Sequence, residues 1–237
     1  MTPSHPDPST SGQGRPIATW PVSEARPALA PAAQRVLRNT YALLAMTLLL
    51  SAAVAVLSLA LQLPGPGPLL GLAISLGLLW AVHRLQHSAW ALPAVFALTG
   101  FMGYSLGPLL TRSLALPGGT EAVALALAST GATFLALSSY VLLTRRDFGF
   151  LGGFLTAGLL IALLAGVAAL LLQIPALALT VSVGVALLSA ALILYETSRI
   201  VHGGETNYVL ATVGLYVSLF NLFTSLLSLF GLGGSDD

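Results

Sequence analysis

From Tyr41 onward, the chain consists of long apolar runs separated by short polar or Pro/Gly-rich breaks. The hydrocarbon core of a bilayer is about 30 Å thick, and roughly 20 helical residues cross it. Seven runs have about this length, at residues 41–61, 69–85, 91–110, 121–143, 151–174, 176–200 and 208–230. The runs are continuous and lack the period-two alternation of a transmembrane β-barrel. The sequence therefore predicts an all-α integral membrane protein, folded as a seven-transmembrane helix bundle.

Two of the seven runs are less regular than the others. The second is free of ionisable groups only from Leu69 to Val82, so His83 and Arg84 have to reach the membrane interface. The last run, 208–230, contains enough polar residues that a re-entrant segment is an alternative to a full span. A full span places the two ends of the chain on opposite sides of the membrane.

Residues 1–34 have a different composition from the rest of the chain. They contain seven of the 14 prolines, mixed with Ser, Thr, Gly and a few charges. Such a segment cannot bury enough apolar surface to offset the entropy lost on ordering. We therefore predict a disordered Pro-rich cytoplasmic tail at 1–34 and a membrane domain at 35–237.

Composition narrows the class of protein further. The chain is 56% hydrophobic and only 7% charged, whereas a soluble domain has about 25% charged residues. The formal net charge of +1 makes nucleic acid an unexpected partner, and the lipid bilayer is the expected one. Because the chain has no cysteine, disulfides, thiol catalysis and cysteine-ligated metals are excluded.

All nine basic residues are arginine, and their distribution predicts the orientation. With the N-terminus in the cytoplasm, Arg112 alone faces outward. The other eight lie on the cytoplasmic side: Arg15, Arg26, Arg35, Arg38, Arg84, Arg145, Arg146 and Arg199. This bias follows the positive-inside rule, and seven full spans then place the C-terminus in the periplasm.

Small and polar residues form stripes within three of the predicted spans. Gly100, Gly103 and Gly107 in the third span include a G-x-x-x-G pair suited to close helix contact. In the sixth span Ser182, Ser189 and Glu196 recur every seven residues. The last span has five such residues on one face: Gly214, Ser218, Asn221, Ser225 and Ser228. Helix packing explains these stripes, and a partly hydrated cavity between the sixth and seventh spans is the alternative.

Glu196 is the acidic residue most clearly placed within a span, and it therefore needs a partner or water. Arg199 lies one turn away, and Arg146 and Asp147 approach from the same side of the membrane. Two interpretations stay open: an interfacial ion pair that sets helix register, or a pH-sensing or gating site.

Catalytic and metal-binding patterns are lacking in the sequence. It contains no H-E-x-x-H, P-loop or G-x-S-x-G motif. His83 and His87 are four residues apart, which would place them on one face of a helix. They lack a convincing third metal ligand. We therefore predict a protein that is not an enzyme and has no resident cofactor or metal.

Four ordered blocks of the chain resemble the bacterial YccA branch of the Bax-inhibitor family. The longest, at 191–231, reads ALILYETSRIVHGGETNYVLATVGLYVSLFNLFTSLLSLFG. The others are VLRNTYALLAMTLLLSA at 36–52, ALTGFMGYSLGPLL at 97–110 and YVLLTRRDFGFLGGFL at 140–155. The resemblance covers residues 35–232. It implies a bundle in which six helices surround a polar last helix.

The resemblance implies two alternative functions in the bacterial inner membrane. Some family members are pH-sensitive calcium leak channels gated by facing carboxylates on the sixth and seventh helices. The sixth-helix position falls on Glu196, but Ser218 occupies the seventh-helix position, so this carboxylate pair is absent. The YccA branch is instead associated with the membrane protease FtsH, as a partner or modulator. We expect such a modulator, with a calcium or cation leak controlled by Glu196 as the alternative and Ca²⁺ as the permeant ion.

Overall fold

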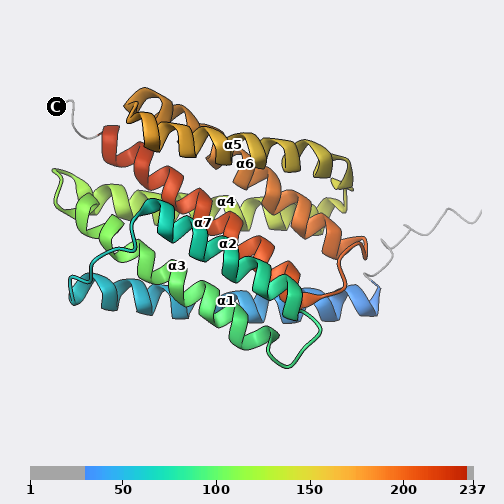
Figure 1. Cartoon of the computed structure of the whole chain (residues 1–237). Helices are drawn as coiled ribbons and strands as arrows, with labels where there is room; N and C mark the ends of the chain where they lie inside the picture. The colour runs from blue at the N-terminus through green and yellow to red at the C-terminus, as the bar shows by residue number, and fades with distance from the viewer. Residues whose placement is uncertain (1–29, 234–237) are drawn as a thin grey trace, which may run out of the picture.

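The computed structural model describes residues 30–233, which form seven α-helices and one short 3-10 helix (Figure 1). Their bounds are α1 Pro31–Ala60, α2 Pro68–Leu85, α3 Ala91–Leu114, α4 Gly119–Thr144, η1 Gly149–Leu151, α5 Gly152–Leu172, α6 Pro175–Val201 and α7 Tyr208–Gly233. All seven α-helices are long and apolar enough to cross a membrane. The predicted all-α bundle with seven spans is confirmed.

The N-terminal boundary differs from the predicted one. Helix α1 begins at Pro31, so residues 31–34, which we assigned to the tail, form its first turn. Proline is favoured there because its fixed φ suits a helix and its missing N–H would have no partner in the first turn. Pro68 and Pro175 also lie at helix starts. Residues 1–29 of the predicted tail lie outside the described residues.

Helix α7 is at the centre of the bundle (Figure 1). It packs against α1, α3, α4 and α6, whereas α2 packs mainly on α3, and α5 on α6. Half of the most apolar stretch of α7 is buried, the largest share among the seven helices. The resemblance therefore predicted the central position of α7 correctly. Four of the six other helices form its main contacts, and α2 and α5 are peripheral.

Glycine permits the closest helix contact, between α1 and α3. A Cβ atom at Gly103 would overlap the backbone of Ser51, and one at Gly107 would overlap Ser58. Ser58 also donates a hydrogen bond of 3.1 Å to the carbonyl oxygen of Tyr104. These contacts confirm the predicted role of the G-x-x-x-G pair. Gly100 faces open space and takes no part in this contact.

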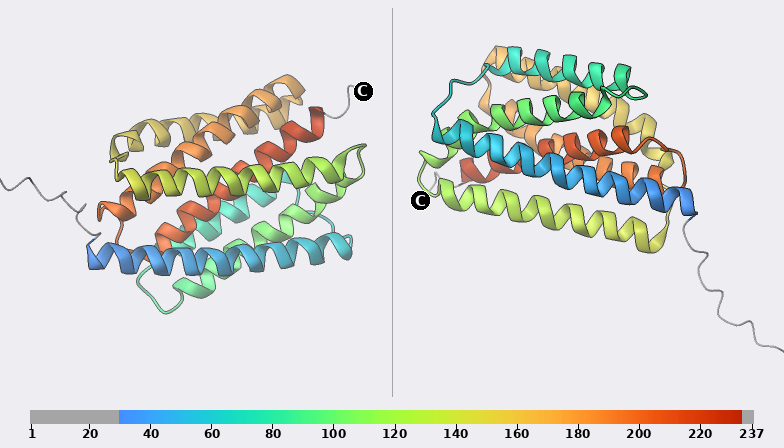
Figure 2. Two further views of the ribbon diagram at one scale, coloured as in Figure 1. Left: turned by 180° about the vertical axis from the view of Figure 1, so that it is seen from behind. Right: turned by 90° about the horizontal axis from the view of Figure 1, so that it is seen from below.

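The two ends of the bundle differ in charge. The α2–α3, α4–α5 and α6–α7 connections lie at the end where α1 begins, and α7 runs to the opposite end (Figure 2). This continuous course of α7 favours the full span over the re-entrant alternative. Of the seven arginines among the described residues, only Arg112 lies at the end where α7 finishes. We call the other end, which holds Arg35, Arg38, Arg84, Arg145, Arg146 and Arg199, the arginine-rich end.

Replacing Gly103 with alanine should destabilise the bundle by about 1–3 kcal/mol, because the added methyl group meets backbone that cannot move aside easily. Gly100→Ala is the matched control, since its methyl group enters open space. Thermal unfolding in mild detergent should give a lower midpoint for Gly103→Ala alone. Equal midpoints for the two variants would contradict the observed α1–α3 packing.

Candidate functional site

Two carboxylates share one arginine at the arginine-rich end of α6. Arg199 Nη1 lies 3.6 Å from Glu196 Oε2, and its Nη2 lies 3.0 Å from Glu205 Oε2. The guanidinium also stacks over the ring of Tyr195, with 5.5 Å between Cζ and the ring centroid. Because the side chains of Glu196 and Glu205 are 14% and 11% exposed, this pairing offsets the cost of burying their charge.

Sequence reasoning identified Glu196 and Arg199 but missed Glu205. We treated its segment, His202-Gly203-Gly204-Glu205, as a break between spans. The chain folds back there because Gly203 has φ +74°, and the N–H groups of Gly204 and Glu205 donate to the carbonyl oxygen of Arg199. Glu205 also accepts a hydrogen bond of 2.9 Å from the backbone N–H of Asn207. An acidic residue directly after two glycines, within reach of the Arg199 turn, is the signal that could have revealed it.

The Glu196 side chain lies directly against the backbone of α7. A Cβ atom built on Gly214 would come within 2.9 Å of its Cδ and Oε1 atoms. Glycine at this position therefore gives the carboxylate room between the two helices. Glu196 thus lies at a tight α6–α7 contact.

Ser218 does not bond to Glu196. Its hydroxyl is buried and donates a hydrogen bond of 2.8 Å to the carbonyl oxygen of Gly214, one turn back in its own helix. Asn221 is half-buried, and its main-chain carbonyl accepts from the hydroxyl of Thr224 at 3.2 Å. Between Tyr208 and Gly233, α7 contains no acidic residue, so this helix supplies no second carboxylate to Glu196.

Asp147 and Arg146 belong to a second cluster, separate from Glu196 and Arg199. Asp147 Oδ1 accepts from the N–H of Gly149 at 2.7 Å and lies 3.4 Å from Ser198 Oγ. The carbonyl oxygen of Arg146 lies 3.4 Å from the same Ser198 hydroxyl. Residues two apart on a helix point about 200° away from each other, so Ser198 and Glu196 lie on different faces of α6. Our grouping of Asp147 and Arg146 with Glu196 was therefore wrong.

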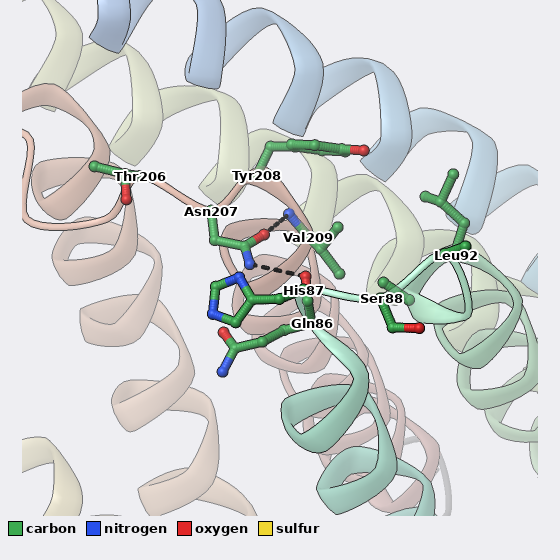
Figure 3. A pocket seen from close by; sticks show the side chains of 10 residues that line it. Gln86, His87, Ser88, Leu92, Thr206, Asn207, Tyr208 and Val209 are labelled. Atoms are coloured by element: carbon green, nitrogen blue, oxygen red, sulfur yellow. Dashed lines mark hydrogen bonds between the residues drawn. The ribbon is translucent and has the colours of Figure 1, made fainter.

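A pocket of about 510 Å³ opens where the α2–α3 connection meets the start of α7 (Figure 3). The Asn207 side chain is central to it. Its Oδ1 caps α7 by accepting from the N–H of Val209 at 2.9 Å, and its Nδ2 donates to the carbonyl oxygen of Gln86 at 3.2 Å. Gln86, His87 and Ser88 line the side formed by the α2–α3 connection. Asn207 thus ties that connection to the first turn of α7.

A hydrogen-bonded tyrosine joins three helices inside the bundle. Tyr216 of α7 is 1% exposed. Its hydroxyl donates to the carbonyl oxygen of Thr99 in α3 at 3.3 Å and lies 2.7 Å from Ser51 Oγ in α1. Since its one proton goes to Thr99, the Ser51 hydroxyl donates to it. We missed this contact because a single tyrosine inside an apolar run does not break the hydrophobic pattern.

The histidines among the described residues form no metal site. His83 Nδ1 lies 2.9 Å from the carbonyl oxygen of Leu79 in its own helix. Within residues 30–233, no three His, Asp or Glu side chains gather as a metal-binding group.

This architecture defines a multi-pass membrane protein with a central polar helix and a charged cluster at the junction of its last two helices. Residues 33–235 match the family described as "Inhibitor of apoptosis-promoting Bax1". The chain belongs to this Bax-inhibitor family.

Bacterial relatives place the chain in the YccA branch of the family. It is 47% identical over 202 residues to the "Modulator of FtsH protease YccA" of Escherichia coli K12, covering 85% of this chain and 92% of that protein. It is 51% identical to an uncharacterized protein of Pseudomonas aeruginosa, with 85% and 91% covered. An uncharacterized membrane protein of Vibrio cholerae is 40% identical, with 86% and 92% covered.

Replacing Tyr216 with phenylalanine should destabilise the bundle by about 1 kcal/mol, because Ser51 and Thr99 each lose a partner where no water replaces it. The test is a double-mutant cycle with Ser51→Ala, measured by reversible unfolding in detergent. The double variant should cost less than the sum of the two single variants. Additive losses would show that the two hydroxyl groups are not coupled.

Proposed function

We propose that this protein is a non-enzymatic inner-membrane modulator of an FtsH-type membrane protease, acting in membrane-protein quality control. The observation that carries the proposal is the 47% identity to the E. coli protein named as such a modulator, over 92% of that protein's length. A second E. coli relative, of the same identity, is named an inner membrane protein.

The arginine-rich end suits contact with a protease that works from the cytoplasm. By the positive-inside rule, we infer that this end lies in the cytoplasm and the C-terminus in the periplasm. The α6–α7 connection contacts the other two connections at this end: Asn207 donates to the carbonyl oxygen of Gln86, and His202 contacts the carbonyl oxygen of Arg145. Residues 1–29, which precede α1 in the sequence, are a second candidate contact.

Co-purification in mild detergent tests the association with the protease. We expect the full chain to retain an FtsH-type protease, and removal of residues 1–29 to weaken the association if the tail contributes. Arg84→Gln combined with Arg146→Gln should weaken it further, because both side chains are exposed at the arginine-rich end. Arg112→Gln, at the opposite end, is the matched control. The proposal would be refuted if neither the full chain nor the shortened chain retained the protease.

A cation leak controlled by Glu196 is the second candidate. It is favoured by the position of the carboxylate between α6 and α7, against Gly214. Two features weigh against it. Arg199 already pairs with this carboxylate, and Ser218 stands where the family's seventh-helix carboxylate would lie. A pair of carboxylates can share a proton and respond steeply to pH, which a glutamate opposite a serine cannot do.

Calcium flux into liposomes tests the cation leak. If Ser218 has disabled a leak, the unmodified protein should conduct little calcium, and Ser218→Asp should create a flux that changes with pH. Ser225→Asp, two turns further along α7, is the matched control. A leak through Glu196 instead requires flux in the unmodified protein that Glu196→Gln alters. Flux unaffected by either substitution would contradict both expectations.

A further inference from the structure

His202 lies between the C-terminal ends of two helices and contacts a carbonyl oxygen at each. It follows the last residue of α6, and its Nδ1 lies 2.9 Å from the carbonyl oxygen of Ser198. Its Nε2 lies 3.1 Å from the carbonyl oxygen of Arg145, the residue directly after α4. The ring therefore bridges α4 and α6 at the arginine-rich end.

A neutral imidazole carries one N–H and cannot donate to both carbonyl oxygens, whereas an imidazolium donates from both nitrogens. The last carbonyls of a helix carry the negative end of the helix dipole, and the Ser198 carbonyl, which accepts from the backbone N–H of His202 at 3.0 Å, has a second lone pair for the ring. His202 lies at two such ends. Only the protonated ring can therefore donate to both carbonyl oxygens at once.

We propose that His202 is a proton-binding clasp that fastens the α4–α5 connection to the end of α6. This regulatory device is separate from the Glu196 cluster and goes beyond the proposed modulation of a protease. With the ring protonated, Nδ1–H donates to the Ser198 carbonyl, and the Ser198 hydroxyl donates to Asp147 Oδ1 at 3.4 Å. The same hydroxyl oxygen accepts from the N–H of Phe148 at 2.9 Å.

Loss of the proton redirects the Ser198 hydroxyl. In the neutral ring Nε2–H keeps its bond to Arg145, and Nδ1 becomes an acceptor, 3.3 Å from Ser198 Oγ. The serine proton then leaves Asp147, so the α4–α5 connection loses one of its links to α6. The clasp is thus tight while the ring is protonated and loosens when the ring loses its proton.

Charged groups around the clasp come from both elements that it joins. The α4–α5 connection supplies Arg145, Arg146 and Asp147, and α6 with the segment after it supplies Arg199 and Glu205. Arg199 is engaged by Glu196 and Glu205. Asp147 is the carboxylate joined to the clasp through Ser198. Helix α7 has no charged side chain from Tyr208 to Gly233.

Hydrogen exchange of the full chain in lipid nanodiscs tests the clasp. After correction for intrinsic exchange rates, residues 145–151 should exchange roughly three- to tenfold more slowly at pH about 5.5 than at about 8. His202→Gln should abolish this difference, because an amide does not titrate in this range. The α3–α4 connection, residues 115–118, is the internal control and should show no such difference.

A second variant guards against a folding defect in His202→Gln. Replacing His5, His83 and His87 with glutamine leaves His202 as the one imidazole, and the pH dependence at 145–151 should persist. Exchange that is indifferent to pH in the unmodified chain would overturn the proposal. Loss of the pH dependence in the triple variant, or its retention in His202→Gln, would assign it to another group and would overturn the proposal as well.

Discussion

The fold depends on satisfying polar groups where no water is available to do so. Hydroxyl groups in the helices mostly bond to the carbonyl oxygen one turn earlier, as Ser218 does to Gly214 and Thr130 to Ala126. Such bonds let a polar helix lie in the centre of an apolar bundle. Where the hydroxyl reaches another helix instead, as at Tyr216, it fixes how α1, α3 and α7 lie against one another. The polar central helix is therefore compatible with a tightly packed interior.

The same constraint concentrates the charged chemistry at one end of the molecule. Glu196 and Glu205 both pair with Arg199 where α6 meets the segment leading to α7. Ser198 and His202, on the same turn of chain, fasten the α4–α5 connection instead. The segment between α6 and α7 thus links the other two connections at the arginine-rich end. This makes it the structural basis for both the proposed partner surface and the proposed clasp.

The predicted site was correct in part, and its errors have a physical cause. The Glu196–Arg199 pair is local, one helical turn apart, so its spacing alone predicted the contact. Asp147 and Arg146 were assigned to the same site because they lie on the same side of the membrane, but the rotation of α6 places them at Ser198. Sidedness follows from the order of spans along the chain. The order of spans does not determine which face of a helix a neighbouring residue contacts.

The number of spans, the segregation of arginine and the family were determined by the sequence alone. The number of spans is a local property, readable in stretches of about 20 residues, because crossing a bilayer imposes a length and an apolar composition on every helix. The segregation of arginine follows from the order of these spans, and the family from four blocks in a fixed order. The tertiary structure alone decided which polar groups meet. His202 contacts a residue 57 positions away, and Tyr216 contacts one 165 positions away. Such pairs depend on how each helix is rotated and packed, and hydropathy carries no information about that rotation.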